Sequence, residues 1–354
     1  MSMGLAADCQ RAYSGFMQRP LSILMPIHNA ATTLEATMES IVAQTFEDFE
    51  LVVVDDGSTD ASIAIVKEIF PDSSRLRVIE PGRVGLVEAL QQGFEACEGK
   101  WIARMDADDL MLPERLEAQL DWAGQFPELQ IIGSEVESFR DNSTETLGEG
   151  YALYDEWLNG LLSSDAIFRE RFVESPIAHP SVMFLKSAIE QIGGYQERGW
   201  PEDYDLWLRA MHHGLLVGKV PKVLLRWRDQ QGRTSRVDER YHHHEFLKCK
   251  AHYLSIGPLS EKKQTVIWGA GTIGKRLGRY LREAGIEIVS YLDIDPKKIG
   301  THSRGVPVVD ACELQRFVGI PLVAAVGARG ARTLIRKELR QAKWIEGSDY
   351  YCAA

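Results

Sequence analysis

Acidic side chains follow two short apolar runs in the first third of the sequence. Asp55 and Asp56 come after Leu51–Val54, and the cluster Asp106-Ala107-Asp108-Asp109 comes after Trp101–Met105. Carboxylates held close together repel one another unless a positive charge lies among them. Mg²⁺ and Mn²⁺ prefer carboxylate oxygens and leave coordination positions for phosphate. The spacing therefore predicts a divalent-metal site, and the alternative interpretation is that the acids cap the helices that follow.

These acids can act together only if the elements before them bring them to one place. Short apolar runs alternate with helical patterns from Leu21 to Met105, which predicts a mostly parallel α/β sheet with helices on both faces. The expected strands are Leu21–Pro26, Leu51–Val54, Leu76–Ile79 and Trp101–Met105. Ligands of such sheets bind beyond the carboxyl ends of the strands, so we expect the acidic clusters to share one edge.

A second pair of acids, Glu202 and Asp203, begins a predicted helix that extends to His213. It follows Gly193-Gly194-Tyr195 and Trp200, which are typical of a loop that faces a substrate. A carboxylate placed there is a candidate general base. The alternative is a pair of ordinary first-turn acids that favour the helix dipole.

A glycine motif opens a second alternation of strands and helices near the C-terminus. Gly269, Gly271 and Gly274 follow the apolar run Thr265–Trp268, and Asp293 ends a strand roughly 20 residues later, as in dinucleotide-binding folds. Such a turn brings phosphate to a helix N-terminus. The pattern predicts a smaller Rossmann-like α/β domain with these four residues as candidate nucleotide contacts, and a purely structural or docking role is the equal alternative.

Length and charge limit the classes of function. A chain of 354 residues exceeds what one core usually serves, so we expect two domains. The predicted parts are a flexible tail at 1–19, a first domain at 20–236, a connecting helix and linker at 237–262, and the Rossmann-like domain at 263–354. The net charge of −11 argues against binding nucleic acid.

Cysteine usage and hydropathy predict the compartment. The five cysteines are odd in number and scattered, which favours reduced thiols over disulfides or a zinc site. No apolar run approaches the roughly 20 residues that cross a bilayer. We therefore expect a cytoplasmic protein.

Taken together, the motifs of the first domain resemble glycosyltransferase family 2, whose members have the GT-A fold. The resemblance covers roughly 21–235. The matching runs, in the family's order, are Pro26-Ile27-His28-Asn29, Gln44-Thr45-Phe46, Val53–Asp60, Gly99–Ile102, Asp106–Asp109, Leu112–Leu116, Gly193–Tyr195 and Trp200–Tyr204.

The resemblance implies a role for each matching residue. Pro26, His28 and Asp56 line the nucleotide base, with Asp56 accepting a base N–H, and Arg83 lies near the base and phosphates. Asp106 contacts the ribose, Asp108 binds the Mn²⁺ or Mg²⁺ that bridges the donor's two phosphates, and Asp203 is the catalytic base.

The sequence departs from the family in two places. His28 stands where the family usually has Tyr, which adds a titratable ring. The segment after Arg228 often carries a His that holds metal or phosphate, whereas this chain has Asp229-Gln230-Gln231-Gly232. The resemblance therefore leaves open whether the metal has a third protein ligand.

The activity implied is transfer of a sugar with inversion, from a nucleotide-diphosphate sugar to a hydroxyl of a glycan or lipid-linked acceptor. A UDP-sugar is the expected donor, and the expected setting is cell-surface polysaccharide biosynthesis with peripheral association at the inner face of the membrane. One alternative is a non-catalytic nucleotide-sugar sensor or scaffold, which the changes at His28 and Gln230 motivate. A second alternative, an NAD(P)-dependent enzyme acting through the glycine motif, leaves Asp108 and Asp203 unexplained.

Overall fold

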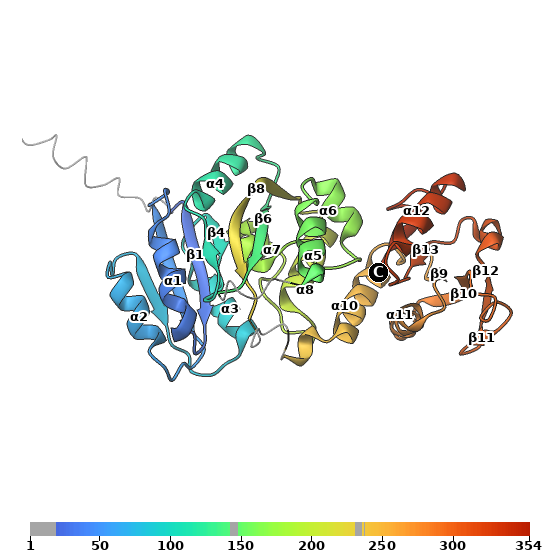
Figure 1. The fold of residues 1–354 in the computed structure, drawn as a ribbon, viewed down its shortest axis with the longest axis horizontal. Helices are drawn as coiled ribbons and strands as arrows, with labels where there is room; N and C mark the ends of the chain where they lie inside the picture. Colours follow the sequence, from blue (N-terminus) through green and yellow to red (C-terminus); the bar gives the residue numbers. More distant parts are fainter. Residues whose placement is uncertain (1–18, 142–147, 231–235, 237) are drawn as a thin grey trace, which may run out of the picture.

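The structure, a computed structural model, describes residues 19–141, 148–230, 236 and 238–354, which form two sheets (Figure 1). The strands of the larger sheet are β1 Leu21–Ile27, β2 Phe49–Asp55, β3 Leu76–Ile79, β4 Trp101–Arg104, β5 Leu110–Met111, β6 Ile131–Phe139, β7 Met183–Leu185 and β8 Val217–Arg228. Their order is β3-β2-β1-β4-β7-β6-β8-β5. The predicted α/β class with a mostly parallel sheet is confirmed.

The register of the central strands positions the acidic residues. Strands β1 to β4 are parallel, with Ile27 opposite Asp55 and Leu24 opposite Arg104, while β7 runs antiparallel to β4 and β6. The carboxyl ends of β1, β2 and β4 therefore meet at one edge. The acids that follow β2 and β4 leave the sheet at that edge.

Helices cover both faces of this sheet. They are α1 Ala31–Val42, α2 Ser62–Ile69, α3 Leu86–Ala96, α4 Arg115–Gln125, α5 Glu149–Asn159, α6 Ser164–Glu170, α7 Lys186–Gln191 and α8 Glu202–His212. Successive residues of β1 belong to two different hydrophobic clusters. Leu24 is in the cluster that contains Phe94 of α3, and Met25 is in the cluster that contains Met38 of α1. A parallel strand buried on both faces is apolar throughout, which explains why β1 and β2 are continuous apolar runs.

The C-terminal part has a second, smaller sheet. Its strands are β9 Gln264–Trp268, β10 Glu287–Asp293, β11 His302–Ser303, β12 Val306–Asp310, β13 Leu322–Ala324 and β14 Tyr350–Cys352, with helices α11 Thr272–Glu283 and α12 Ala331–Gln341. The order is β11-β12-β10-β9-β13-β14, parallel except for β11. The five parallel strands thus have the 3-2-1-4-5 order of doubly wound folds, and the predicted Rossmann-like fold is confirmed.

Helix α10, His243–Ile256, lies between the two sheets (Figure 1). One buried cluster extends from Leu24 of β1 through Leu254 of α10 to Leu277 of α11. The Lys250 ammonium of α10 donates to the Val173 carbonyl at 2.7 Å and to the Ala353 carbonyl at 3.3 Å. The two sheets are therefore joined by a continuous core. The predicted domain boundaries stay predictions, and of the predicted tail 1–19 only residue 19 is among the described residues.

Candidate active site

The acidic loop after β4 brings three carboxylates together. Asp106, Asp108 and Asp109 each offer an oxygen, and these oxygens lie within 4.8 Å of one another. Two threonines of α1 hold the loop's backbone: the Thr33 hydroxyl donates to the Ala107 carbonyl at 3.0 Å, and the Thr37 hydroxyl donates to the Asp109 carbonyl at 2.9 Å. The start of α1 is thus a support for the loop, which is a role that its sequence pattern did not predict.

Each carboxylate of the loop also contacts a basic or amide group. Asp106 forms an ion pair with Arg104, which is 2% exposed. Asp108 Oδ2 accepts a hydrogen bond from the Gln230 side-chain amide at 2.7 Å, and Asp109 Oδ1 accepts one from the Arg228 backbone N–H at 2.8 Å. Three carboxylates with an amide beside them form an all-oxygen donor set of the kind that Mg²⁺ and Mn²⁺ prefer, so these residues fit such an ion.

The segment after Arg228, where the family often has a histidine, is described in part. Asp229 and Gln230 belong to the described residues, whereas Gln231 and Gly232 lie outside them. Asp229 is buried, and it accepts hydrogen bonds from Arg140 and Tyr151, both at 2.8 Å. Asp229 is thus held by protein groups, and Gln230 is the described residue of this segment that reaches the acidic loop.

Asp56 and Arg83 lie at the same carboxyl edge of the larger sheet as the acidic loop. Asp56 Oδ1 accepts the backbone N–H groups of Val84 at 2.6 Å and Gly85 at 2.8 Å, and Oδ2 accepts from the Arg83 guanidinium at 2.6 Å. The Asp56 side chain is 6% exposed, whereas that of Arg83 is 61% exposed. The buried carboxylate therefore fixes the turn that presents an exposed cation at the sheet edge.

The end of β1 lies against the turn that follows β2. Pro26 is buried within β1, and His28 is exposed just beyond it. The backbone N–H of Asn29 donates to the Ser58 hydroxyl at 2.9 Å, and the Asn29 side-chain oxygen accepts from the Thr59 N–H at 2.8 Å. These bonds hold His28 in the loop that faces the Asp56 turn.

The acid pair Glu202–Asp203 begins α8 as predicted. Both oxygens of Glu202, which is 1% exposed, accept from the Tyr241 hydroxyl at 2.7 and 2.8 Å, and Asp203 Oδ1 accepts from the Tyr204 N–H at 2.7 Å. Burial, and then the charge of Glu202, raise the pKa of Asp203 to about 8. Burial also raises the pKa of Glu202. Asp203 keeps some exposure to solvent, and a carboxyl group with a pKa near neutrality is suited to proton transfer.

A buried polar layer lies beneath these acids. His179 shares a 2.8 Å hydrogen bond with the Tyr195 hydroxyl, and its other ring nitrogen lies 3.9 Å from a Glu202 oxygen. Burial lowers the pKa of His179 well below its usual range, so the ring is neutral. Arg104 opposes the burial effect on Asp203, since its charge lowers the pKa of that carboxyl. Arg104 therefore acts electrostatically on both the acidic loop and the α8 acids.

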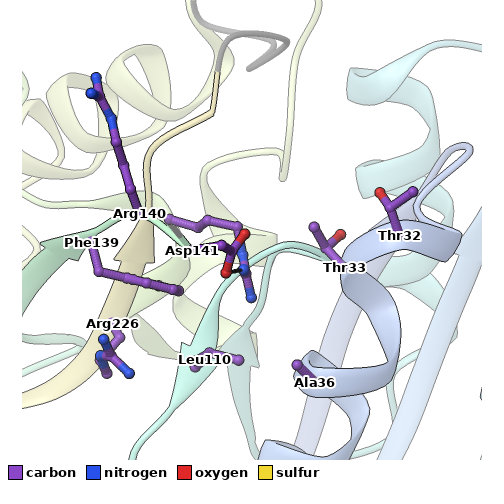
Figure 2. Close-up of a pocket in the computed structure, with 9 residues that line it drawn as sticks. Thr32, Thr33, Ala36, Leu110, Phe139, Arg140, Asp141 and Arg226 are labelled. Atoms are coloured by element: carbon purple, nitrogen blue, oxygen red, sulfur yellow. Dashed lines mark hydrogen bonds and ion pairs between the residues drawn. The ribbon is translucent and has the colours of Figure 1, made fainter. Parts of the chain in front are cut away.

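A cavity of about 380 Å³ opens on the α1 side of the acidic loop (Figure 2). Its lining comprises Thr32, Thr33, Ala36, Leu110, Phe139, Arg140, Asp141, Arg226 and Arg228. It adjoins the loop, because the Arg228 guanidinium donates to the Asp108 carbonyl. Among the described residues that line this cavity there is none of the predicted donor-binding residues. The cavity is therefore a neighbour of the predicted donor site and does not coincide with it.

In the C-terminal part, the glycine motif forms the tight turn between β9 and α11. Gly269 has a φ of +122°, and a Cβ on Gly274 would lie 1.9 Å from the Gly269 carbonyl oxygen. Asp293 Oδ2 accepts from the Ala270 N–H at 2.9 Å and from the Lys298 ammonium at 3.0 Å. Gly271 differs, because a Cβ there would meet nothing within 4 Å in the described chain. Packing explains Gly269 and Gly274, whereas Gly271 leaves open space at the N-terminus of α11.

The contacts that Arg104, Tyr241 and Gln230 make in the site escaped the sequence reasoning, although Gln230 itself was noted as a departure from the family. Arg104 had a local signal, because it is a charged residue inside an apolar strand directly before an acidic motif. Tyr241 and Gln230 had none, since their partners Glu202 and Asp108 lie 39 and 122 positions away.

The residues predicted to bind the donor and metal gather along one edge of the larger sheet. All but one lie in or just beyond the strands β1, β2 and β4, and Arg83 lies in the turn after β3. The full set is Pro26, His28, Asp56, Arg83, Asp106 and Asp108. The predicted base, Asp203, lies in the first turn of α8, and Arg104, which pairs with Asp106, also acts on its pKa.

Comparisons with known proteins identify a family for the chain. The profile of Glycosyl transferase family 2 matches residues 22–193. The amylovoran biosynthesis glycosyltransferase AmsE of Erwinia amylovora is 32% identical over 210 residues, which cover 58% of this chain and 75% of that protein. The UDP-Gal:alpha-D-GlcNAc-diphosphoundecaprenol beta-1,3-galactosyltransferase of Escherichia coli is 27% identical over 208 residues, 58% of this chain and 72% of that protein.

Among solved structures, S. aureus TarS in complex with UDP-GlcNAc has a similar fold. Its TM-score is 0.52 at 16% identity, over 74% of this chain and 71% of that chain. At this identity the likeness concerns the fold alone. Within the described residues, no helix combines the length and apolar character needed to cross a membrane.

Proposed function

The chain belongs to glycosyltransferase family 2, and on that premise we propose that it transfers a sugar, with inversion, from a UDP-sugar to a hydroxyl of a glycan or lipid-linked acceptor. The observation that carries the proposal is the acidic loop, whose three carboxylates have oxygens within 4.8 Å of one another at the carboxyl edge of the sheet. The names of the two relatives support a polysaccharide or lipid-linked product and, for one of them, a UDP-sugar donor.

In this proposal the edge of β1 and β2 binds the donor. Pro26 and His28 line the base, and Asp56 accepts a base N–H at Oδ2, the oxygen that also accepts from Arg83. Arg83 carries an exposed positive charge toward the base and phosphates. Charge-assisted hydrogen bonds of this kind orient a phosphate strongly.

Asp108, with Asp106 beside it at the ribose, would hold Mn²⁺ or Mg²⁺. A divalent ion bound there supplies a Lewis acid that neutralises charge on the departing diphosphate. Gln230 holds Asp108 Oδ2 in place through its amide N–H groups, and its amide oxygen is the candidate third ligand. The family's histidine is thus replaced by a group that serves as donor or acceptor without titrating.

Asp203 is the proposed general base. Its Oδ1 accepts the Tyr204 N–H, so Oδ2 takes the proton of the acceptor hydroxyl. That hydroxyl oxygen forms a bond to the anomeric carbon while the bond from this carbon to the diphosphate oxygen breaks, and the electron pair leaves with the nucleoside diphosphate. Attack opposite the leaving group inverts the anomeric configuration.

Release of nucleoside diphosphate tests the proposal. A panel of nucleotide sugars is incubated with the protein, with and without Mn²⁺ or Mg²⁺, beside Asp108→Asn, Asp203→Asn and the exposed control Asp121→Asn. We expect metal-dependent release that Asp108→Asn and Asp203→Asn lose and Asp121→Asn keeps. Donor binding without turnover across several acceptors would favour a sensor or scaffold instead, and absence of both binding and turnover would refute the transferase proposal.

The C-terminal part is proposed to bind a nucleotide at Gly269, Gly271, Gly274 and Asp293. The open space at Gly271 allows a phosphate to approach the α11 N-terminus. Gly271→Ala should keep the fold and weaken nucleotide binding, whereas Gly274→Ala should destabilise the protein through the clash with Gly269. Equal nucleotide affinity in the parent and Gly271→Ala would favour a structural role, and tight NAD(H) binding with hydride transfer would favour the redox alternative.

The proposed setting is the cytoplasm, at the inner face of the membrane when the acceptor is lipid-linked. A flotation assay with vesicles that carry a polyprenyl-diphosphate sugar measures this association. Recruitment to these vesicles above the level on plain lipid supports it, and equal recovery on both would contradict it.

A further inference from the structure

A second cavity, of about 250 Å³, lies where the two sheets of the molecule join. Its walls come from α8, from the segment around Arg171 after α6, from the end of α10, and from the last strand β14 with the turn before it. The described residues that form these walls include none of those assigned to sugar transfer or to the glycine motif. A ligand site in this cavity is therefore independent of the proposed function.

Arg171 is the one basic side chain other than His212 among the described residues that line this cavity. It is 6% exposed, and within the described residues no Asp or Glu forms an ion pair with it. It donates a hydrogen bond to the Phe168 carbonyl, and its guanidinium carbon lies 3.5 Å from the Phe168 ring centroid and 4.5 Å from that of Phe172. Burial lowers the pKa of Arg171 to about 10, which reflects the cost of holding this charge.

Two other buried arginines in the described chain have fuller sets of partners. Arg209 pairs with Asp205 at 3.0 Å. Arg115, which also lacks an acid partner among the described residues, donates to the Arg104 and Val182 carbonyls and to the Gln119 side chain. Buried charges are normally paired or fully hydrogen-bonded. Arg171 is thus a cation that lines a cavity, and the described part of the chain offers its guanidinium no hydrogen-bond acceptor beyond the Phe168 carbonyl.

The remaining walls indicate the kind of ligand. Phe172, Met211 and Tyr351 supply apolar and aromatic surface, and the Tyr351 hydroxyl is already bonded to the Gly347 carbonyl at 2.8 Å. The volume equals roughly eight waters at about 30 Å³ each, which suits an aromatic ring with one charged group. Guanidinium groups bind carboxylate and phosphate oxygens through two parallel hydrogen bonds.

We propose that this cavity binds a small oxyanion with a flat apolar body, a carboxylate or a phosphate monoester, whose charged end pairs with Arg171. The ligand's body packs against Phe172, Met211 and Tyr351. Because the walls come from helices α6, α8 and α10 and from strand β14 of the smaller sheet, the bound anion stabilises the junction of the two parts, and it contacts α8 at the end opposite Asp203.

Binding of three probes tests the proposal: 4-fluorobenzoate, phenyl phosphate and inorganic phosphate, titrated calorimetrically into the full chain at low ionic strength. The two aromatic probes distinguish a carboxylate from a phosphate head, and inorganic phosphate measures what the apolar body adds. Ligand-observed fluorine NMR follows 4-fluorobenzoate independently. We expect at least one aromatic probe to bind more tightly than inorganic phosphate.

Three variants locate the site. Arg171→Met removes the charge, Met211→Trp fills the cavity with Arg171 retained, and Arg169→Met is the matched control, since its side chain is 50% exposed and pairs loosely with Glu170 at 3.9 Å. We expect Arg169→Met to bind as the parent does, and the other two to lose at least about tenfold in affinity. Melting temperatures show whether each variant folds.

Two results would overturn the proposal. One is the absence of binding of all three probes to the parent, which would leave Arg171 as a structural cation held by its aromatic neighbours. The other is an Arg171→Met variant that binds the probes with the same affinity as the parent protein. Should Arg171→Met not fold, parental affinity in Met211→Trp overturns the proposal in the same way.

Discussion

At the scale of single residues, the proposed role of Asp203 as a general base depends on the groups that surround it. A carboxylate in water is ionised at neutral pH and is a weak base. Burial and the neighbouring Glu202 raise the pKa of Asp203 to about 8, while Tyr241 donates to both oxygens of Glu202. The site thus combines one carboxylate held by hydrogen bonds with a second whose proton affinity is raised.

The pH dependence of transfer should follow the pKa of Asp203. A general base acts in its deprotonated form, so kcat/KM should rise about tenfold per pH unit below pH 8 and level off above it. Initial rates between pH 5.5 and 9.5, at fixed metal concentration, measure the profile. A flat profile between pH 6 and 8 would show that no group with this pKa limits the reaction.

Replacing Glu202 with Gln should shift that profile toward acid. The substitution removes a like charge beside Asp203 and keeps an oxygen that accepts from Tyr241, so the pKa of Asp203 should fall. The control is Glu190→Gln, an exposed acid of α7, which should leave the profile in place. If Glu202→Gln and Glu190→Gln have the same pH profile, the proposed effect of the Glu202 charge on the pKa of Asp203 is contradicted.

At the scale of elements, α1 supports the acidic loop that β4 delivers to the sheet edge. The single proton of the fully buried Thr37 hydroxyl is shared between the Asp109 carbonyl at 2.9 Å and the Ala107 carbonyl at 3.1 Å. Valine has nearly the same shape as threonine but cannot donate this bond. The support is therefore open to test without a change in packing volume.

Thr37→Val should weaken metal binding while the fold is kept. Loss of the hydroxyl removes this donor from the Asp109 carbonyl, while the Ala107 carbonyl keeps the Thr33 hydroxyl; the change costs about 1–3 kcal/mol and loosens the loop that carries Asp108. We expect the Mn²⁺ concentration for half-maximal activity to rise about three- to tenfold. The control Thr45→Val removes an exposed hydroxyl bonded to Glu117 and should change nothing. An unchanged metal requirement in Thr37→Val would show that α1 does not position the loop.

At the scale of the whole molecule, a continuous core and one buried ion pair join the two sheets. Arg336 of α12 donates to Glu170 of α6 at 2.6 Å, and Glu170 is 5% exposed. Helix α10 lies between the sheets and contributes Lys250, which bonds to both parts (Figure 1). These contacts predict that both parts unfold in one transition.

Glu170→Gln should destabilise the whole chain. It replaces a buried, charge-assisted bond with a neutral one, and the expected loss is about 1.5–3 kcal/mol of unfolding free energy in urea, monitored by tryptophan fluorescence. Glu313→Gln is the control, because its pair with Arg316 is exposed and should contribute less than about 0.5 kcal/mol. Two separate transitions, or equal effects of the two variants, would refute a shared core stabilised by this pair.

The sequence by itself determined the α/β alternation, the places of the acidic clusters and the resemblance to a family. These features follow from local patterns. A strand that ends in the acidic cluster Asp106–Asp109 can be recognised from adjacent residues, without knowledge of any partner distant in the sequence. The same holds for the glycine turn at Gly269–Gly274, where Gly269 has a positive φ and Gly274 packs against the Gly269 carbonyl.

The groups that surround those residues became evident from the folded chain. Gln230 meets Asp108 from 122 positions away, Tyr241 reaches Glu202 across 39, and Arg171 faces a cavity built from both parts of the chain. A pKa, an ion pair or a cavity depends on burial and on partners that are distant in the sequence. The spacing of neighbouring residues predicts neither the burial nor those partners. For that reason the sequence identified Asp203 as a candidate base, and the fold decided its proton affinity.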